Sequence, residues 1–257
     1  MGLTSTTTTT SITFLGHATL RIALDGAILL TDPILRTFAY GLVHRQPVQD
    51  VAQMVADVDH VLISHLHRDH LDMASLHRLP STVQVIVPRG GGNVVRRGGI
   101  PSVKELAVGE CVDVRGVKIW ATPAAHNGFR APFGPMAECL GFLVEGSKRI
   151  YFAGDTDIFE AMADLAPVDV ALLPIAGWGP KLGPGHMGPA EAVRAIGLLR
   201  PGLVIPIHWG SLVPLGMHLR TWSYLVRPPL SFAELARHAH PGVEVRILEP
   251  GETLDLA

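Results

Sequence analysis

The chain has 257 residues, of which 47% are hydrophobic and 17% charged, a composition typical of one compact α/β domain with a substantial core. Its net charge of -2 excludes a global basic field, so we expect neither a nucleic-acid partner nor attraction to anionic lipid. The two cysteines, Cys111 and Cys139, exclude a disulfide framework and favour a reducing cytoplasm.

The chain starts with a threonine-rich tract that lacks the basic and apolar regions of a signal peptide, and we expect residues 1–11 to be disordered. Residues 12–257 show no linker-like composition and no short-period repeat, which indicates a single domain. No apolar run approaches the roughly 20 residues that span a bilayer. We therefore expect a cytoplasmic protein without a membrane span.

Short apolar runs separated by turn residues predict a series of strands in the first half of the chain. Asp25-Gly26 predicts a hairpin turn. Irregular structure is expected for most of residues 34–50, and a flexible loop for residues 89–92. The predicted strands are residues 12–15, 19–24, 27–31, 61–64, 83–87, 103–106, 111–114 and 117–121, and the predicted helices are residues 48–55 and 71–79.

The second half continues with strands and adds longer helices. Pro189 suits the first turn of one of these helices. Many strands with helices between them indicate two sheets that are covered by helices on their outer faces. The predicted strands are residues 139–145, 149–152, 168–174, 203–207, 243–248 and 253–256, and the predicted helices are residues 158–165, 189–199 and 232–240.

Four residues that can bind a metal fall within six positions in the H-x-H-x-D-H stretch formed by His65, His67, Asp69 and His70. A buried strand precedes the stretch and a helical pattern follows it, so the cluster lies on a strand-to-helix turn. In such a turn, side chains two and three positions apart can converge on one point. Three imidazoles and a carboxylate placed together favour a bound cation between them.

Three other candidate ligands also lie after strand-like runs. Asp155 and His208 follow their strands directly, and His126 comes a few residues beyond residues 117–121. Strand ends in a layered α/β fold gather along one edge. Seven groups are too many for one four-coordinate zinc, but they fit two divalent metals that share a carboxylate. Imidazole and carboxylate ligands suit Zn²⁺, Fe²⁺ or Mn²⁺, with Zn²⁺ the favoured ion.

This pattern resembles the metallo-β-lactamase superfamily. Residues 15–19 (LGHAT), 31–33 (TDP) and 186–192 (HMGPAEA) are similar to the branch that contains L-ascorbate-6-phosphate lactonases and the N-acylphosphatidylethanolamine-hydrolysing phospholipase D. The resemblance covers nearly the whole chain and implies a four-layer αββα sandwich. It implies one metal bound by His65, His67 and His126, a second bound by Asp69, His70 and His208, and Asp155 as the bridging ligand.

Two cations at such a site lower the pKa of a bound water and polarise a carbonyl or phosphoryl oxygen. We therefore expect a hydrolase whose metal-bound hydroxide cleaves a small-molecule ester, lactone or phosphodiester. The catalytic candidates are Asp69, His186 and Asp32. Asp32 is expected either to orient a metal ligand or to cap the turn after Thr31, and His17 is a weaker candidate to orient a ligand. The resemblance makes His186 a candidate to bind or protonate the substrate, and the alternative for His186 is a cap position before the helix that begins at Pro189.

Substrate contacts are expected from the glycine- and proline-rich loop of residues 175–185, where Trp178 and Lys181 join His186 as candidates. Residues 129–133 could form the facing wall. The apolar stretch of residues 212–230 is longer than a simple connection needs, and indicates a lid or a subunit contact of a homo-oligomer.

Three alternatives remain open from the sequence. The first is a nuclease acting on RNA or DNA, which the near-neutral charge disfavours. The second is a di-iron redox centre, which His67 disfavours because that branch tends to carry Glu at this position. The third is a metal-binding protein of the same fold without catalytic activity.

Overall fold

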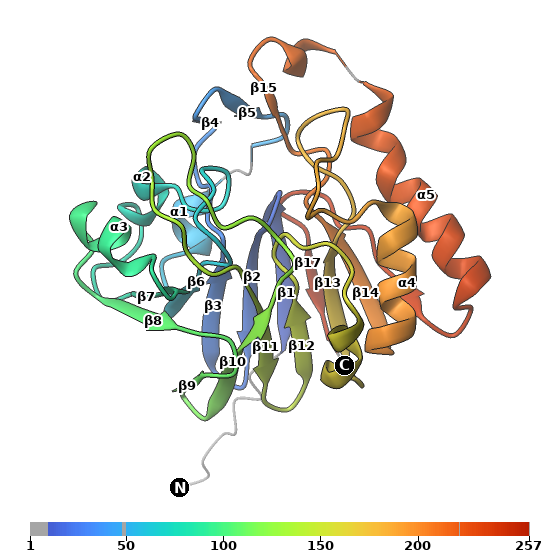
Figure 1. Cartoon of the computed structure of the whole chain (residues 1–257), viewed down its shortest axis with the longest axis horizontal. Helices are drawn as coiled ribbons and strands as arrows, with labels where there is room; N and C mark the ends of the chain where they lie inside the picture. Colours follow the sequence, from blue (N-terminus) through green and yellow to red (C-terminus); the bar gives the residue numbers. More distant parts are fainter. Residues whose placement is uncertain (1–9, 48–49, 221, 257) are drawn as a thin grey trace, which may run out of the picture.

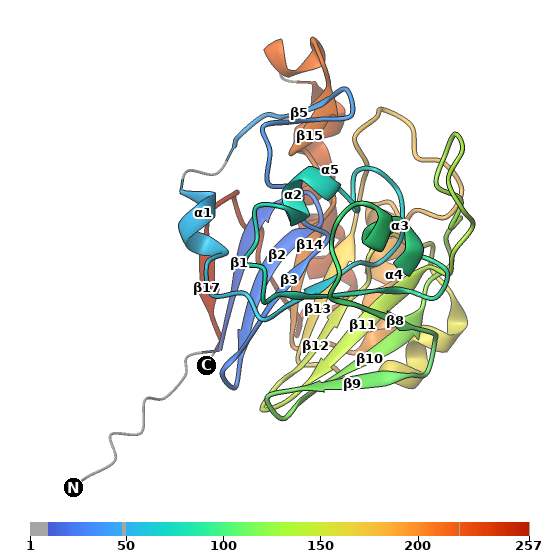
Figure 2. The ribbon, with the colours of Figure 1, turned by 90° about the vertical axis from the view of Figure 1, so that its left-hand side faces the viewer.

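The computed structural model describes residues 10–47, 50–220 and 222–256. Two seven-stranded sheets face each other, and helices cover the outer face of each (Figures 1 and 2). This arrangement confirms the predicted αββα sandwich. Among the described residues, no helix is long and apolar enough to cross a membrane.

The first sheet has the strand order β17-β1-β2-β3-β6-β7-β8, and three short helices lie on its outer side. Its strands are β1 (Ser11–Gly16), β2 (Thr19–Leu24), β3 (Ala27–Thr31), β6 (His60–Leu62), β7 (Gln84–Pro88), β8 (Val103–Leu106) and β17 (Thr253–Asp255). The helices are α1 (Val51–Met54), α2 (Met73–Leu76) and α3 (Gly92–Arg97).

The second sheet has the order β16-β14-β13-β12-β11-β10-β9 and packs against two longer helices and one 3₁₀ helix. Its strands are β9 (Cys111–Val114), β10 (Val117–Pro123), β11 (Leu140–Glu145), β12 (Arg149–Phe152), β13 (Val170–Pro174), β14 (Leu203–Ile207) and β16 (Glu244–Val245). The helices are η1 (Glu160–Leu165), α4 (Pro189–Leu199) and α5 (Ser223–Ala239). A small third sheet joins β4 (Phe38–Ala39), β5 (Leu42–His44) and β15 (Leu212–Pro214), which η2 (Met217–Leu219) follows.

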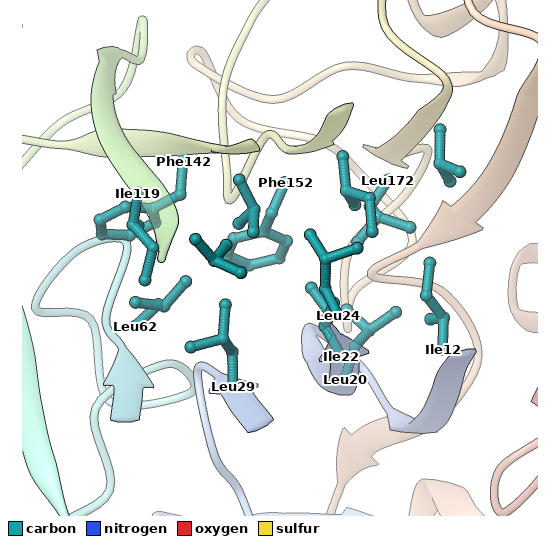
Figure 3. Packing of buried hydrophobic residues seen from close by; sticks show 14 of the residues in the cluster. Ile12, Leu20, Ile22, Leu24, Leu29, Leu62, Ile119, Phe142, Phe152 and Leu172 are labelled. Atoms are coloured by element: carbon teal, nitrogen blue, oxygen red, sulfur yellow. The ribbon is translucent and has the colours of Figure 1, made fainter. Parts of the chain in front are cut away.

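The main core lies between the two large sheets, where Leu20 and Ile22 of β2 meet residues such as Phe142 and Phe152 (Figure 3). Strand β13 is buried along its whole length, and this burial explains why its sequence is continuously apolar. Its alternate residues serve two cores, because Leu172 faces the other sheet and Ala171 faces the helices.

The parallel strands position the candidate site. Strand β3 runs parallel to β6, and β12, β13 and β14 run parallel to one another. Their carboxyl ends therefore lie along one end of the sandwich, the upper end in Figure 1. The small sheet of β4, β5 and β15 stands at the same end.

Some sequence predictions were wrong in detail. Strand β1 begins at Ser11, which belongs to the tract expected to be disordered, whereas residues 1–9 lie outside the described residues. The stretch expected to be irregular contains β4 and β5, and helix α3 begins at Gly92, the end of the expected flexible loop. The predicted helix at residues 48–55 is described only from residue 50, and its helical part is α1.

The expected long loop of residues 212–230 contains β15, η2 and the first turns of α5. Two prolines, Pro228 and Pro229, predict a break in this region, yet they lie inside the helix. Leu225, Pro229, Phe232 and Ala236 are spaced along one face and are buried, so packing against the second sheet and α4 outweighs the lost backbone hydrogen bonds.

Candidate metal centre

The H-x-H-x-D-H stretch forms a turn between β6 and α2. Its start is fixed by Asp32, which accepts hydrogen bonds from the backbone N and the Oγ of Ser64 at 2.7 and 2.5 Å. Its end is fixed where the backbone N atoms of His70 and Leu71 donate to the carbonyl of His67 at 3.1 and 2.8 Å. The turn therefore presents its histidines toward the carboxyl ends of the second sheet's strands.

Three imidazoles form the first group of the centre. Nδ1 of His67 lies 3.1 Å from Nε2 of His126, which reaches the group from the loop after β10. The ring of His65 lies against both, with centroid distances of 4.4 and 4.6 Å. Nε2 of His65 is buried and has no hydrogen-bond partner among the described residues.

A second group lies beside the first and contains a carboxylate. Nε2 of His70 lies 3.2 Å from Nε2 of His208, and Oδ2 of Asp69 lies 3.7 and 3.8 Å from these two atoms. His17, which follows β1, places its Nε2 3.2 Å from the same Asp69 oxygen. One ligand atom from each of these four residues lies within 4.8 Å of all the others.

Asp155 carries the carboxylate next to the second group. Oδ2 lies 3.1 Å from Nε2 of His70, and Oδ1 lies 3.2 Å from Nε2 of His208. The Oδ1 contact does not form a hydrogen bond, so this buried oxygen is left without a partner among the described residues. On its other side, Oδ2 lies 3.5 Å from Nε2 of His186.

Hydrogen bonds on the outer side of the imidazoles fix their orientation. Nδ1 of His70 lies 2.7 Å from Oδ2 of Asp32, Nδ1 of His208 donates to the carbonyl of Ala176 at 2.8 Å, and Nδ1 of His126 donates to the carbonyl of Gly185 at 2.7 Å. With Nδ1 protonated, each Nε2 directs a lone pair into the centre. Inward lone pairs with oriented outer nitrogens are the arrangement found around metal ions in proteins.

The charges of the centre also fit a cation. Burial lowers the pKa of His65 well below its ordinary value and, with other groups offsetting part of the shift, lowers that of His126 to about 4. Burial also opposes protonation of His70, but the carboxylates of Asp155 and Asp69 outweigh burial and hold its pKa well above its ordinary value. The buried carboxylates thus require a positive charge nearby, and the neutral imidazoles beside them offer lone pairs. A divalent cation satisfies both requirements.

The structure brings all seven predicted ligands together: His65, His67, Asp69, His70, His126, Asp155 and His208. The other predicted catalytic residues occupy two different positions. Asp32 is fully buried behind His70 and contacts that ring directly. It also reaches His65 through Ser64, whose Oγ donates to Asp32 and lies 3.0 Å from Nδ1 of His65. His186 is about a quarter exposed in its side chain and lies against Asp155, where the hydrogen bond to Asp155 raises its pKa.

The residues predicted to contact the substrate differ in where the structure places them. Trp178, Lys181, His186 and His208 line a cavity of about 150 Å³ beside the centre. Of the predicted wall at residues 129–133, Phe133 is 97% exposed and Arg130 is buried, donating to the carbonyl of Leu66, and none of these residues lines that cavity.

His17 was the weakest candidate from sequence, yet it is 1% exposed and contacts two residues of the centre. Besides its contact with Asp69, its carbonyl accepts a hydrogen bond from the backbone N of His208 at 2.8 Å. The signal was available, since His17 directly follows a strand as the other candidates do. Its φ of 57° shows that a tight turn after Gly16 places it there.

An αββα sandwich with a histidine and aspartate cluster at its strand ends defines the metallo-β-lactamase class of proteins. A family model described as a β-lactamase superfamily domain matches residues 28–209. The chain belongs to this superfamily, which confirms the resemblance seen in the sequence.

Individual relatives cover almost the whole chain. A UPF0173 metal-dependent hydrolase of Methanopyrus kandleri is 31% identical over 252 residues, covering 95% of this chain and 99% of the relative. An N-acyl-phosphatidylethanolamine-hydrolyzing phospholipase D of Caenorhabditis elegans is 31% identical over 250 residues, covering 87% of this chain and 68% of the relative. Among solved structures, the metallo hydrolase Igni18 of Ignicoccus hospitalis has a TM-score of 0.75 at 25% identity, covering 97% and 99% of the two chains.

Proposed function

We propose that this protein is a metal-dependent hydrolase that holds two divalent cations and cleaves an ester, lactone or phosphodiester bond of a small molecule. The observation that carries the proposal is the convergence of buried lone pairs, above all Nε2 of His65 and Oδ1 of Asp155, which have no partner among the described residues. Leaving such groups unsatisfied costs free energy that a bound cation would recover. The similarity to a metal-dependent hydrolase and to a phospholipase D supports the hydrolase part of this proposal.

We infer a separate position for each cation from the two groups of side chains. The first cation would be held by His65, His67 and His126, and the second by Asp69, His70 and His208. Asp155 would contact both, since its carboxylate lies beside the second group and next to His186, which packs on His126 at a ring distance of 4.7 Å. Imidazole and carboxylate donors without thiolate suit Zn²⁺ best, with Mn²⁺ or Fe²⁺ also compatible.

When bound, the cations supply Lewis acidity that activates water and polarises the scissile bond. The residues of the chain supply position and proton transfer. Asp32 holds His70 through Nδ1 and so fixes the direction of Nε2. His186 stands at the open side of Asp155, where its Nε2 can donate a hydrogen bond or a proton to a substrate oxygen.

The cavity next to His186 is the proposed substrate pocket. Trp178 and Lys181 line it, so the indole would pack on an apolar part of the substrate and the ammonium would pair with an anionic part. Both cysteines are free thiols, Cys111 exposed and Cys139 buried, which agrees with a cytoplasmic enzyme.

Metal analysis combined with turnover tests the proposal. The purified protein is assayed for metal content and for hydrolysis of a panel of lactones and of bis(p-nitrophenyl) phosphate. We expect two equivalents of metal, turnover of at least one substrate, and joint loss of metal and turnover in His65→Ala and Asp155→Ala. Full turnover by protein verified as metal-free would contradict the proposal. Two tightly bound metals without turnover of any ester, lactone or phosphodiester would favour the non-catalytic alternative.

A further inference from the structure

Four segments join into a ring around the open side of the metal centre, and we call this ring the rim. It consists of residues 34–47, 127–137, 175–187 and 209–222, of which residue 221 is not described. All four stand at the upper end of the molecule in Figure 1 and remain there in Figure 2.

Contacts between neighbouring segments close the ring. Strand β5 pairs with β15, which joins the first segment to the last. Nδ1 of His208 donates to the carbonyl of Ala176, and Nδ1 of His126 donates to that of Gly185. Arg68 of the metal motif bridges the remaining gap, because its guanidinium lies 5.0 Å from the ring centre of Tyr40 and its Nε donates to the carbonyl of Ala131 at 3.4 Å.

The rim concentrates the exposed apolar surface of the protein. It comprises 52 of the 257 residues, yet it holds ten of the fourteen large apolar side chains that are exposed among the described residues. Phe133 and Leu219 are the most exposed of all, at 97% and 77%, and they belong to segments on different sides of the ring. Such a patch around a functional site marks an interaction surface. The ten are Phe38, Tyr40, Phe129, Phe133, Met136, Trp178, Leu182, Leu215, Leu219 and Trp222.

The rim also has a charge of one sign. Its sequence contains five lysines and arginines and no aspartate or glutamate, whereas the remainder of the chain has 16 lysines and arginines against 23 acidic residues. Arg36 is paired with Asp72 at 2.7 Å and Arg130 is buried. Arg45, Lys181 and Arg220 remain, and none of them forms an ion pair among the described residues. The net charge of -2 therefore hides a cationic rim and a strongly acidic remainder.

These two properties select one kind of partner. A second copy of this chain in a two-fold contact would place the cations of one rim against those of the other, with no rim carboxylate to pair with them. A nucleic acid would satisfy the cations but would leave aliphatic side chains such as Leu215 and Leu219 against phosphates. A bilayer with anionic headgroups satisfies both, because cations pair with the headgroups while exposed apolar side chains enter the acyl boundary.

We propose that the rim docks this protein on the surface of an anionic lipid bilayer. Docking through the rim directs the open side of the metal centre toward the lipid. The inference concerns a binding surface and goes beyond the proposed hydrolysis, because it holds or fails whether or not a given substrate is turned over.

Vesicle binding tests the inference. The full-length protein is sedimented with vesicles of phosphatidylcholine alone and with vesicles of phosphatidylcholine and phosphatidylglycerol in equal parts, at low and high salt. We expect binding to the mixed vesicles at low salt, weaker binding at high salt, and at least about tenfold weaker binding to phosphatidylcholine alone, because the rim cations are attracted only where the headgroups carry net negative charge. Absence of binding to the mixed vesicles at low salt would overturn the proposal.

Variants assign the binding to the rim. Phe133→Ser combined with Leu219→Ser, and separately Arg220→Gln combined with Lys181→Gln, should each weaken binding about tenfold or more. The matched control combines Val108→Ser with Arg97→Gln, which are exposed positions outside the rim, and should bind as the parent does. Arg220 and Lys181 are exposed, so the double variant that replaces them should fold. It therefore tests the proposal even if the variant that replaces Phe133 and Leu219 does not fold.

Tryptophan fluorescence locates the contact. Three of the four tryptophans belong to the rim, and Trp120 lies outside it. Trp178 and Trp222 are exposed, whereas Trp209 is half-buried and stacks on Phe14. Brominated lipid in the mixed vesicles should quench the parent protein, and the quenching should fall when Trp178 and Trp222 are both replaced by Phe. Equal quenching in that double variant would overturn the proposal. So would a stable dimer in solution that Phe133→Ser dissociates, or salt-sensitive binding to a single-stranded oligonucleotide without vesicle binding.

Discussion

The carboxylate of Asp32 and the imidazole of His70 form a buried pair, in which Oδ2 lies 2.7 Å from Nδ1 and both side chains are inaccessible to solvent. Among the described residues, His70 is the only predicted ligand whose ring is paired with an aspartate that is not itself a predicted ligand. Asp32 contacts His70 directly and His65 only through the Oγ of Ser64, so its effect should be larger at the second cation position than at the first.

Asp32→Asn should weaken binding of the second cation by about 10- to 100-fold and that of the first cation less, because the amide removes the charge that holds His70 in place and reaches His65 only through Ser64. Competition titration with a chromophoric chelator measures the two affinities. Asp72 is a matched control, since it is equally buried and also accepts a bond from a serine Oγ, but its partners are Ser75 and Arg36. Asp72→Asn should lower stability without changing either metal affinity. Equal losses at both positions in Asp32→Asn would refute a role through His70.

His17 should support the same cation position through Asp69. We expect His17→Ala to lower affinity at the second position about tenfold, because Asp69 loses the hydrogen bond that orients its Oδ2. His17→Gln places an amide N–H near the same oxygen and should retain part of the affinity. Absorption of the cobalt-substituted protein reports the geometry directly, and spectra identical in parent and His17→Ala would argue against this contact.

His186→Gln should slow turnover about 100-fold or more with both metals retained, since a positioned proton donor contributes on that scale. The measurement is kcat on the best substrate of the panel, together with metal content. His77→Gln is a suitable control, because His77 is exposed and its Nε2 donates to the carbonyl of Gly98 and not to a group of the centre, so the change should alter neither quantity. Loss of metal in His186→Gln would instead make His186 a ligand.

His44 should make stability depend on pH. This residue is 6% exposed and donates to the carbonyl of Ile34 from Nε2, and burial lowers its pKa below the ordinary 6.5. As the pH falls below about 6.5, His44 takes up a proton in the unfolded chain but not in the folded chain. The contribution of neutral His44 to the free energy of unfolding is therefore fully present above that pH. It decreases as the pH drops toward the folded pKa, by up to about 1.4 kcal/mol per pH unit.

Urea unfolding at several pH values measures this effect as the difference between the parent and His44→Gln. The difference isolates His44 from the histidines of the metal centre, which titrate in both proteins. A constant difference in unfolding free energy from neutral pH to about pH 5 would show that His44 does not titrate as expected.

Local sequence patterns were enough to predict many strands of this protein and its candidate metal ligands. Apolar runs ending at His65, Asp155 and His208 predicted both the strands and the ligands, because strand ends in a layered fold share an edge. The same reasoning applies to β13, whose continuous apolar sequence follows from burial on both faces. These features depend on neighbours in the chain and can be read without the fold.

The remaining features depended on contacts between distant parts of the chain, which local periodicity does not encode. His17 meets Asp69 across 52 positions and His70 meets His208 across 138, and only the packing of the two sheets brings those atoms together. Helix α5 continues through Pro228 and Pro229 because its buried face packs on the second sheet and α4, which outweighs the local propensity of proline. The overall charge of -2 excluded a basic field, but the tertiary structure gathered four separate acid-free segments at one end, since a charge distribution in space follows from the fold and not from the sum of the charges.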